Sequence, residues 1–448
     1  MTPTLHDHLG IAIPHLLLPK IGTNLTTWSV VACDQFTSQP EYWKSVENLV
    51  GKNPSTLQLI FPEVYLGKGE DGIRIAHIHQ HMHQYLQSNL FAEHAGTILV
   101  ERQSKHHKQF HTRHGIMLAL DLEQYEYTKG STSLIRATEG TIIERLPPRI
   151  RIREGAPLEA PHIMVLIDDP AKTVIEPLQQ SKDLRIVYDF DLMMDSGHLK
   201  GFAVPDDALA TAIQALEKLA DPISFAKHYQ LNHKTGVLLF AVGDGNHSLA
   251  TAKAIWTKLK EQAPDKTVIS THPARYALVE VVNVHDPGLV FEPIHRVLFE
   301  IKEDLVKALG AEFGNDVHIE SCTNMTEMMQ RVDQPAGKDQ IVGIVTSKGY
   351  SVVYFTNTKA NLAVGTLQTF LDNFVRRGGC KEIDYVHGSD VVKELGERVG
   401  NAGFYLPAMD KRELFRTVIL DGALPRKTFS MGEANEKRFY CEARRILP

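Results

Sequence analysis

The sequence predicts an α+β protein with a mixed sheet in its N-terminal and central part, followed by a smaller α/β part. Short apolar runs indicate strands at 97–100, 115–120, 162–167, 183–191 and 275–284. From about residue 301 onwards, helical and strand patterns alternate more regularly, as they do in α/β proteins. The chain has 448 residues, which is more than one hydrophobic core usually serves. We therefore expect two domains, 1–300 and 301–448.

The composition is that of an average soluble globular protein, with 43% hydrophobic and 23% charged residues. No apolar run is long enough to span a bilayer, and the N-terminus lacks the basic start and apolar core of a signal peptide. A net charge of −6 gives no basic surplus for binding nucleic acid. The four cysteines lack CxxC spacing, which argues against disulfides and thiolate zinc sites. We expect a cytoplasmic protein that acts on a small molecule, with no nucleic-acid or membrane partner and an oligomeric state left open.

The chain is organised around residues 243–248, Gly-Asp-Gly-Asn-His-Ser, which we call the motif loop. An apolar run ends at Val242 and Ala-rich helical spacing begins at Leu249, so the loop is predicted to join a strand to a helix. Its glycines allow close backbone approach, and a helix start offers N–H groups to an anion. Aspartate, asparagine and serine are also ordinary capping residues, but a capping turn has no use for His247 beside them. We therefore interpret the loop as a phosphate cradle with a metal or proton site.

Two carboxylates outside the motif loop are candidates for proton transfer. Asp34 ends an expected short buried strand over 28–36, and it either faces a site or makes an Asx turn before the next helix. Glu139 lies between two threonines in the segment 136–141, a setting that suits a carboxylate base or metal ligand. The five arginines between 136 and 153 form either a solvated face or the lining of an anion pocket, for which Arg145 is our candidate.

Basic residues late in the chain are expected to return to the cradle. His295 and Arg296 end a predicted strand, where a scaffold can aim side chains at a ligand. The tail loop of the second domain, 424–435, is dense in polar groups, and we expect Lys427 to close over the site. One pocket is therefore predicted to be lined by Glu139, Asp244, His247, His295 and Lys427.

Two further patterns are poor candidates for a site. Residues 67–72 fit the GxGxxG pattern, but Glu70 and Asp71 would repel a pyrophosphate. The following helix carries four histidines at alternate positions, His77, His79, His81 and His83. A polar helix face explains them, since a metal site needs a third ligand that the spacing does not supply, and we assign the cluster no role.

Four segments together resemble the bacterial and archaeal domain-of-unknown-function family numbered 1015, nearly end to end. They are the motif loop, Arg136-x-x-Glu-x-Thr141, His285-Asp-x-Gly-Leu with Pro293-x-His295-Arg296, and Pro425-Arg-Lys. The family's signatures read Arg-His-Glu-x-Thr and Ala-Asp-Gly-His-His-Arg. This chain departs from them at Ala137, Asn246 and Ser248, which replace the first histidine, the second histidine and the arginine.

The Asp-Gly-x-His core of the motif loop is also similar to the phosphate motif of the ParB/sulfiredoxin superfamily, which includes an archaeal kinase of free serine. This resemblance covers the central motif alone. It implies a ParB/sulfiredoxin-like core in the first domain, with phosphate or metal held by Asp244, Gly245, Asn246 and His247. It also implies that Glu139 serves as the base.

These observations favour a nucleotide-dependent phosphotransferase that acts on a small polar metabolite and uses ATP or ADP with Mg²⁺. Such chemistry needs positioning and charge neutralisation more than covalent steps. The expected catalytic residues are Glu139, His247 and Asp34, and Asp244 is the expected metal ligand. The cofactor would be bound by Asp244, Gly245, Asn246, Ser248, Arg145, His295, Arg296 and Lys427. The alternatives are a non-catalytic nucleotide-binding switch and a metal-dependent hydrolase with histidine and aspartate ligands.

Overall fold

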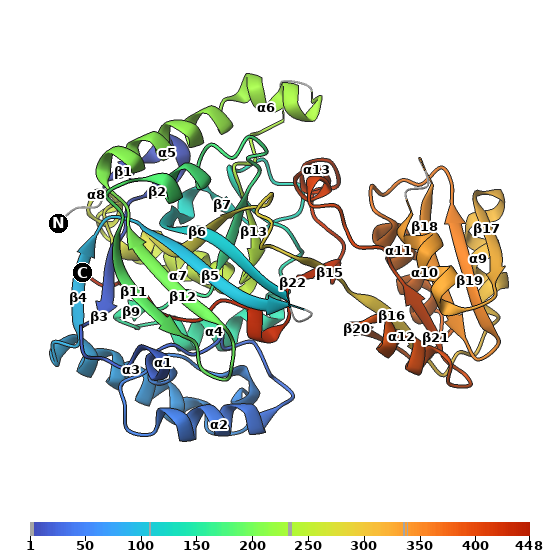
Figure 1. Ribbon diagram of the computed structural model, residues 1–448, viewed down its shortest axis with the longest axis horizontal. Helices are drawn as coiled ribbons and strands as arrows, with labels where there is room; N and C mark the ends of the chain where they lie inside the picture. Colours follow the sequence, from blue (N-terminus) through green and yellow to red (C-terminus); the bar gives the residue numbers. More distant parts are fainter. Residues whose placement is uncertain (1–3, 107–108, 232–234, 335–336, 338) are drawn as a thin grey trace. The chain divides into compact units, whose positions relative to one another are not determined.

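The computed structural model describes residues 4–106, 109–231, 235–334, 337 and 339–448. The chain forms two compact units (Figure 1): the first comprises Met1–Leu289 and Gly432–Pro448, and the second comprises Val290–Met431. The chain thus enters the second unit before the expected boundary at residue 300. Its last residues return to the first unit, which differs from the expected division into 1–300 and 301–448.

The first unit is built on a large mixed sheet, in agreement with the predicted fold class. Its strands lie in the order β11 (Arg185–Asp191), β12 (His198–Ala203), β5 (Ile98–His106), β6 (Gln109–Asp121), β14 (Tyr276–Asn283), β10 (Met164–Ile167), β13 (Phe240–Asp244), β8 (Ile135–Ala137) and β7 (Tyr125–Glu126). The same sheet also includes β1 (Leu5–His6) and β2 (Ile11–Ala12), since β1 pairs with β2 and β2 pairs with β6. Two separate pairs join β3 (His15–Pro19) to β4 (Phe91–Ala95) and β9 (Leu158–Glu159) to β23 (Arg444–Arg445).

Eight α-helices of the first unit are described. They are α1 (Leu25–Trp28), α2 (Pro40–Val50), α3 (Asp71–Gln87), α4 (Leu146–Arg153), α5 (Asp206–Leu219), α6 (Pro222–Tyr229), α7 (Asn246–Gln262) and α8 (Lys266–Ile269). Pro205 is the N-cap residue of α5.

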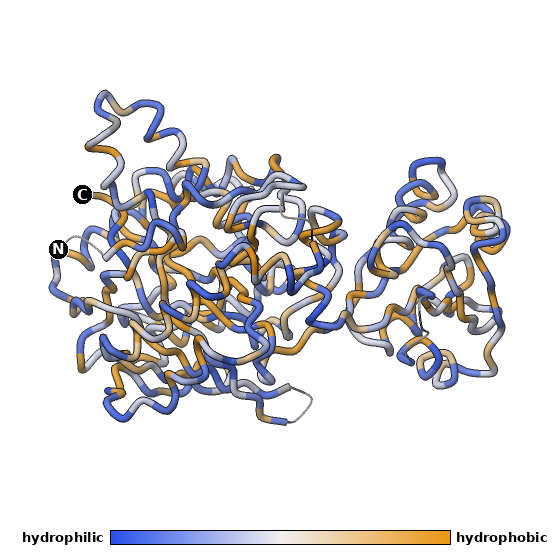
Figure 2. The backbone as a smooth tube through the Cα atoms, turned by 90° about the horizontal axis from the view of Figure 1, so that it is seen from above, coloured by the Kyte–Doolittle hydropathy of each residue, from blue (hydrophilic) through white to orange (hydrophobic). Residues whose placement is uncertain are grey.

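Both faces of the large sheet are buried, each in its own hydrophobic core. Successive residues of a central strand point to opposite sides, so one strand contributes side chains to both cores. Leu118 of β6 packs in one core with residues of α5 and α7, whereas Met117 packs in a second core with α2 and the C-terminal tail. Figure 2 shows hydrophobic segments running through the inside of this unit and hydrophilic ones on its outer loops.

Strand pairing collects the candidate residues at one edge of the sheet. The β13 strand runs parallel to β8, with Val242 opposite Ala137. It runs antiparallel to β10, with Asp244 opposite Met164. The end of β13, the end of β8 and the start of β10 therefore lie together. This edge carries the motif loop, Glu139 and His162.

The second unit has the alternating helices and strands that the sequence predicts. Its six-stranded sheet has the order β17 (Val317–Cys322), β19 (Gly349–Phe355), β18 (Gln340–Thr346), β21 (Ala402–Tyr405), β16 (His295–Phe299) and β20 (Glu382–Val386). A small pair joins β15 (Phe291–Pro293) to β22 (Phe429–Met431). The helices are α9 (Leu305–Phe313), α10 (Met325–Asp333), α11 (Ala363–Arg376), α12 (Ser389–Gly396) and α13 (Arg412–Asp421).

The strand expected over 28–36 does not form. Trp28 ends α1, and Val31 makes a single bridge to Phe439 of the tail. The backbone N–H of Ala32 donates to Arg438 O, and that of Tyr440 donates to Val30 O. The apolar run is therefore buried by pairing with the C-terminal tail. The local sequence pattern does not predict this pairing. None of the described helices is long and apolar enough to cross a membrane.

Candidate functional site

The motif loop forms the predicted strand–turn–helix junction. Gly245 is the N-cap of α7 with a φ of 78°, and a Cβ there would lie 3.0 Å from Ile163 Cα, so the position requires glycine. The first hydrogen bond within the helix runs from Leu249 N to Gly245 O. The N–H groups of residues 246–248 therefore have no acceptor within α7, which is the arrangement that binds anions at helix starts.

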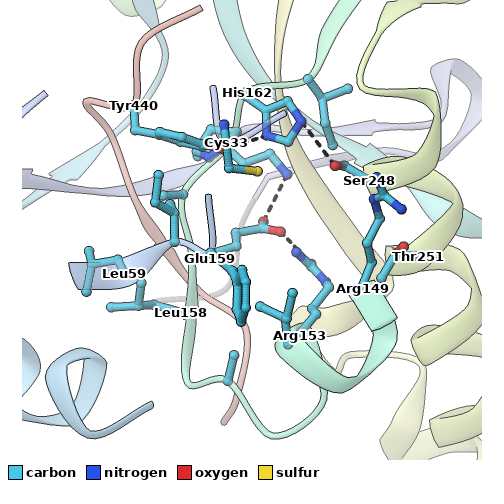
Figure 3. Close-up of a pocket in the computed structure, with 18 of the residues that line it drawn as sticks. Cys33, Leu59, Arg149, Arg153, Leu158, Glu159, His162, Ser248, Thr251 and Tyr440 are labelled. Atoms are coloured by element: carbon cyan, nitrogen blue, oxygen red, sulfur yellow. Dashed lines mark hydrogen bonds and ion pairs between the residues drawn. The ribbon is translucent and has the colours of Figure 1, made fainter. Parts of the chain in front are cut away.

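A cavity of about 140 Å³ lies beside the start of α7. One wall is apolar and includes Leu59, Phe61, Met82, Ile152 and Leu158, and the polar lining comes from four separate segments (Figure 3). Its polar side chains include Glu63, Arg149, Arg153, Glu159, His162, Ser248, Thr251 and Tyr440. This volume suits one small polar group and is too small for a whole nucleotide, since pockets for drug-sized ligands exceed about 300 Å³.

Three of these side chains form a hydrogen-bonded chain. Ser248 Oγ lies 3.1 Å from His162 Nε2, and His162 Nδ1 lies 2.9 Å from Tyr440 Oη. The Tyr440 oxygen also accepts the backbone N–H of Cys33 at 3.1 Å. His162 and Tyr440 are buried, whereas Ser248 is half-buried on the cavity wall. The imidazole is thus held through both of its nitrogens.

Opposite charges meet at the same edge. Lys437 Nζ lies 3.3 Å from Asp244 Oδ2, and Asp244 Oδ1 accepts the Gly245 N–H at 2.9 Å. Burial by itself would raise the pKa of Asp34, but His162, the hydrogen bond from Gln35 and Lys437 outweigh it and lower that pKa. Asp34 is therefore an anion beside an imidazole and an ammonium group.

A second ion pair lies on the cavity wall. Arg149 Nη2 pairs with Glu63 Oε1, and Arg149 Nη1 donates to the backbone oxygen of Arg145 at 2.7 Å. Burial raises the pKa of Glu63 against the opposing charge of Arg149, and the negative charge of Asp34 raises it further. Arg145 itself is exposed, and the arginines that line the cavity are Arg149 and Arg153.

Glu139 lies close to the start of the motif loop. Ala137 is paired with Val242, so Asp244, at the end of β13, and Glu139, which follows β8, both lie two residues beyond that pair. Thr138 Oγ1 donates to Val242 O at 2.6 Å and fixes the end of β8. Among the described residues, the cavity lining includes Ser248 but not Glu139, Asp244 or His247, which lie at the edge of the sheet next to it.

A comparison with models of protein families shows to which family the chain belongs. The family model described as "Protein of unknown function (DUF1015)" matches residues 17–374. The chain belongs to the DUF1015 family. None of the curated proteins compared with it matches.

Solved structures similar to this DUF1015 protein share about a tenth of its sequence. A free serine kinase mutant in complex with ADP has 10% identity, covers 73% of this chain and 91% of its own, and has a TM-score of 0.37. SbnI with a C-terminal truncation, from Staphylococcus aureus, has 10% identity, coverages of 70% and 82%, and a TM-score of 0.33. A conserved hypothetical protein from Pyrococcus furiosus has 10% identity, coverages of 73% and 90%, and the same TM-score. Likenesses this distant carry no argument about function.

The three departures of this DUF1015 protein from the signatures occupy different surroundings. Ala137 is buried in β8. Asn246 Nδ2 lies 3.5 Å from Val242 O, and its buried Oδ1 has no hydrogen-bond partner among the residues that the structure describes. Ser248, in place of arginine, contacts His162. The last substitution exchanges a cation for a hydroxyl in the first turn of α7.

His295 and Arg296 are core residues of the second unit. The His295 ring stacks on Tyr405, and its Nδ1 accepts the Leu406 N–H at 3.1 Å. Burial, with the charges of Arg296 and His387, lowers the pKa of His295 to about 4. The Arg296 guanidinium donates to Gln368 Oε1 and to backbone oxygens of residues 294 and 426. This differs from the expectation that the two side chains are presented to a phosphate, because both are buried and their polar groups contact neighbouring residues of the second unit.

Lys427 lies exposed on the second unit, with a φ of 55°. Lys427 and His295 belong to the second unit and Asp244 to the first, and a pocket lined by all three stays a prediction. The lysine that the structure places beside the motif loop is Lys437, from the returning tail of the first unit.

The histidine-rich helix is α3, and its contacts are local. His79 Nε2 lies 2.9 Å from Ile152 O, and His81 Nδ1 lies 2.8 Å from His77 O. Within the described parts of the chain, no group of three side chains that could hold a metal ion occurs. The GxGxxG segment follows the 3₁₀ turn Glu63–Tyr65 rather than a strand, which argues against a dinucleotide fingerprint.

Five residues of the site were missed by sequence reasoning as individual candidates. They are Glu63, Arg149, His162, Lys437 and Tyr440. Two signals were present in the sequence. His162 is the first residue of a predicted strand, and Arg149 belongs to the arginine cluster for which an anion pocket was one interpretation. The sequence gives no such signal for Glu63, Lys437 and Tyr440, because they reach the site only when the tail and the segment before α3 fold against the first unit's sheet.

Proposed function

We propose that this DUF1015 protein is a nucleotide-dependent phosphotransferase for a small polar metabolite, with the transferred phosphate held at the start of α7. The observation that carries the proposal is the meeting of three features at one edge of the sheet. These are the N–H groups at the start of α7, the cation Lys437 and the anionic carboxylate Asp34. Phosphoryl transfer requires this combination of charge neutralisation and a nearby proton acceptor.

The residues divide into three roles. The α7 start and Lys437 neutralise the phosphate charge. Asp34 receives the proton of an acceptor hydroxyl, and Glu139 lies one strand away from the motif loop at the same edge. The cavity, with its apolar wall and the Glu63–Arg149 pair, has room for the acceptor, while the nucleoside lies outside it.

The carboxylates suit Mg²⁺. Magnesium is bound by one or two protein carboxylates together with substrate phosphates and water, and it neutralises phosphate charge. Asp244 and Asp34 both interact with Lys437, so their carboxylates face a common cation. Asp244 is therefore the residue that would hold the metal of a bound nucleotide.

A thermal-shift screen of the full chain with ATP, ADP, CTP and GTP in the presence of Mg²⁺ tests the proposal. A ligand that binds only the folded state, at 100 times its dissociation constant, adds about 2.7 kcal/mol to the free energy of unfolding. We expect at least one nucleotide to raise the melting temperature. Stabilisation by divalent metal alone, without a response to any nucleotide, would contradict the proposal and favour a metal-dependent hydrolase.

A further inference from the structure

The arrangement of Ser248, His162 and Tyr440 goes beyond phosphate binding. A nucleophile and a base within hydrogen-bond reach, with the base oriented by a third group, is the geometry of an activated nucleophile. Here Ser248 Oγ is 3.1 Å from one imidazole nitrogen, and Tyr440 Oη is 2.9 Å from the other. We propose that Ser248 is a nucleophilic serine that takes the phosphoryl group from a nucleoside triphosphate and then passes it to the acceptor. This inference rests on the proposed function.

A purely structural role does not account for the position of Ser248. Helix capping belongs to the N-cap residue, which is Gly245, and Ser248 is the third residue of α7. Its hydroxyl points at the imidazole and lines the cavity (Figure 3). It also lies in the first turn of α7, where the positive end of the helix dipole stabilises negative charge on an attacking oxygen or a phosphate.

The groups around His162 are polar. Asp34 is an anion near the imidazole, because His162, the hydrogen bond from Gln35 and Lys437 hold the pKa of its carboxyl below the usual value despite burial. Burial raises the pKa of Tyr440 well above its ordinary value, so it remains a neutral phenol that positions the ring. Burial, with the charges of Asp34 and Glu63, also raises the pKa of Cys33. Its thiol is therefore a poor competitor as nucleophile.

The transfer balances in two steps. In the first, Ser248 Oγ attacks the terminal phosphorus, its proton passes to His162 Nε2, and the bond to the departing nucleoside diphosphate breaks. In the second, the acceptor hydroxyl attacks the phosphoserine and gives its proton to Asp34. The Ser248 oxygen then leaves the phosphorus and recovers its proton from His162.

The test is incubation of the full chain with Mg²⁺ and γ-labelled ATP, without an acceptor, followed by peptide mapping. We expect label on Ser248, none in Ser248→Ala, and about 100-fold slower labelling in His162→Gln, the low end for loss of a general base. Tyr440→Phe should slow labelling without changing ATP affinity, as expected for a positioning residue. The matched control is Ser45→Ala, because Ser45 is exposed on α2 and donates its hydroxyl to Glu41 O at 2.9 Å, and this variant should be labelled at the wild-type rate.

Tryptophan fluorescence of each variant verifies its folding. A fluorophosphonate probe tests the serine independently of ATP, and it should label Ser248 in the wild type and fail with His162→Gln. ATP binding with neither ATP-derived nor probe-derived label on Ser248 would overturn the nucleophile while leaving the proposed phosphotransferase intact. Probe labelling without ATP binding would instead overturn the phosphotransferase and the phosphoryl donor.

Discussion

The two units contain polar side chains at strand ends that look alike in the sequence but have different surroundings. In the first unit, Ser248 and His162 lie beside a cavity at the end of β13 and the start of β10. In the second unit, His295 and Arg296 begin β16 and are almost completely buried, with their polar groups used by neighbouring backbone and side chains. Residue type alone does not tell which of the two pairs lines a cavity and which is part of a core.

The difference lies in what covers each strand end. At the start of β16, His295 stacks on Tyr405 and accepts the Leu406 N–H, and Arg296 donates to Gln368 and to backbone oxygens, so both side chains are enclosed by their partners. The end of β13 is followed by a glycine turn and a helix start, and the returning tail covers it with Lys437 and Tyr440 while leaving a cavity. Polar residues at a strand end therefore indicate a site only where the covering segments leave room for a ligand.

The largest expected effect is on the second unit. Arg296→Met leaves the oxygens of Gln368, Ile294 and Arg426 without their buried donor, so the unfolding free energy of this unit should fall by about 4 kcal/mol. Hydrogen exchange over 290–431 measures it, because the three tryptophans all lie in the first unit. Nucleotide affinity should not change. Lost affinity with a stably folded second unit would make Arg296 a ligand residue.

Arg149→Met is the matched substitution in the first unit. Arg149 lines the cavity, so the same change should weaken nucleotide or acceptor binding while leaving hydrogen exchange over 290–431 unaltered. Equal losses of stability in the two variants would remove the distinction between core and cavity.

The next effect is a pH dependence confined to the second unit. The pKa of His295 is lowered to about 4 in the folded protein, against 6.5 for an ordinary histidine. The unfolded state therefore binds the proton more tightly than the folded state does. The contribution of neutral His295 to the unfolding free energy of the second unit is complete above pH 6.5 and is lost as the pH falls towards 4. It amounts to at most about 3 kcal/mol. The unfolding free energy of wild type minus that of His295→Gln, followed by hydrogen exchange, should decrease over this range; a constant difference would contradict the assignment.

A smaller effect is expected at the turn of the motif loop. Gly245→Ala places a side chain at a φ of 78° and a Cβ 3.0 Å from Ile163 Cα, which should destabilise the first unit by about 2 kcal/mol. Denaturation followed by tryptophan fluorescence measures this. Gly140→Ala at the same edge is the control, because nothing lies within 4 Å of its added Cβ, and it should change stability by no more than about 0.5 kcal/mol.

The smallest effect distinguishes two lysines. Lys437→Met removes the cation beside Asp244 and should weaken nucleotide binding about tenfold, or about 1.4 kcal/mol. Lys427→Met changes an exposed residue of the second unit and should leave the dissociation constant unaltered. Titration of the nucleotide that stabilises the protein measures both. A larger loss for Lys427 would support the original expectation that it closes over the site.

The sequence by itself determined the local elements of this protein. The apolar run up to Val242, the two glycines and the helical spacing after Ser248 act within a few residues, so the junction of β13 and α7 followed from propensity and patterning. The alternation of helices and strands in the second unit followed for the same reason. Only the tertiary structure decided which strand ends meet and what covers them. The pairing of β13 with β8 and β10, and the return of Lys437 and Tyr440 to the motif loop, join residues up to 278 positions apart. Such contacts depend on which cores form, and a local sequence pattern does not encode them.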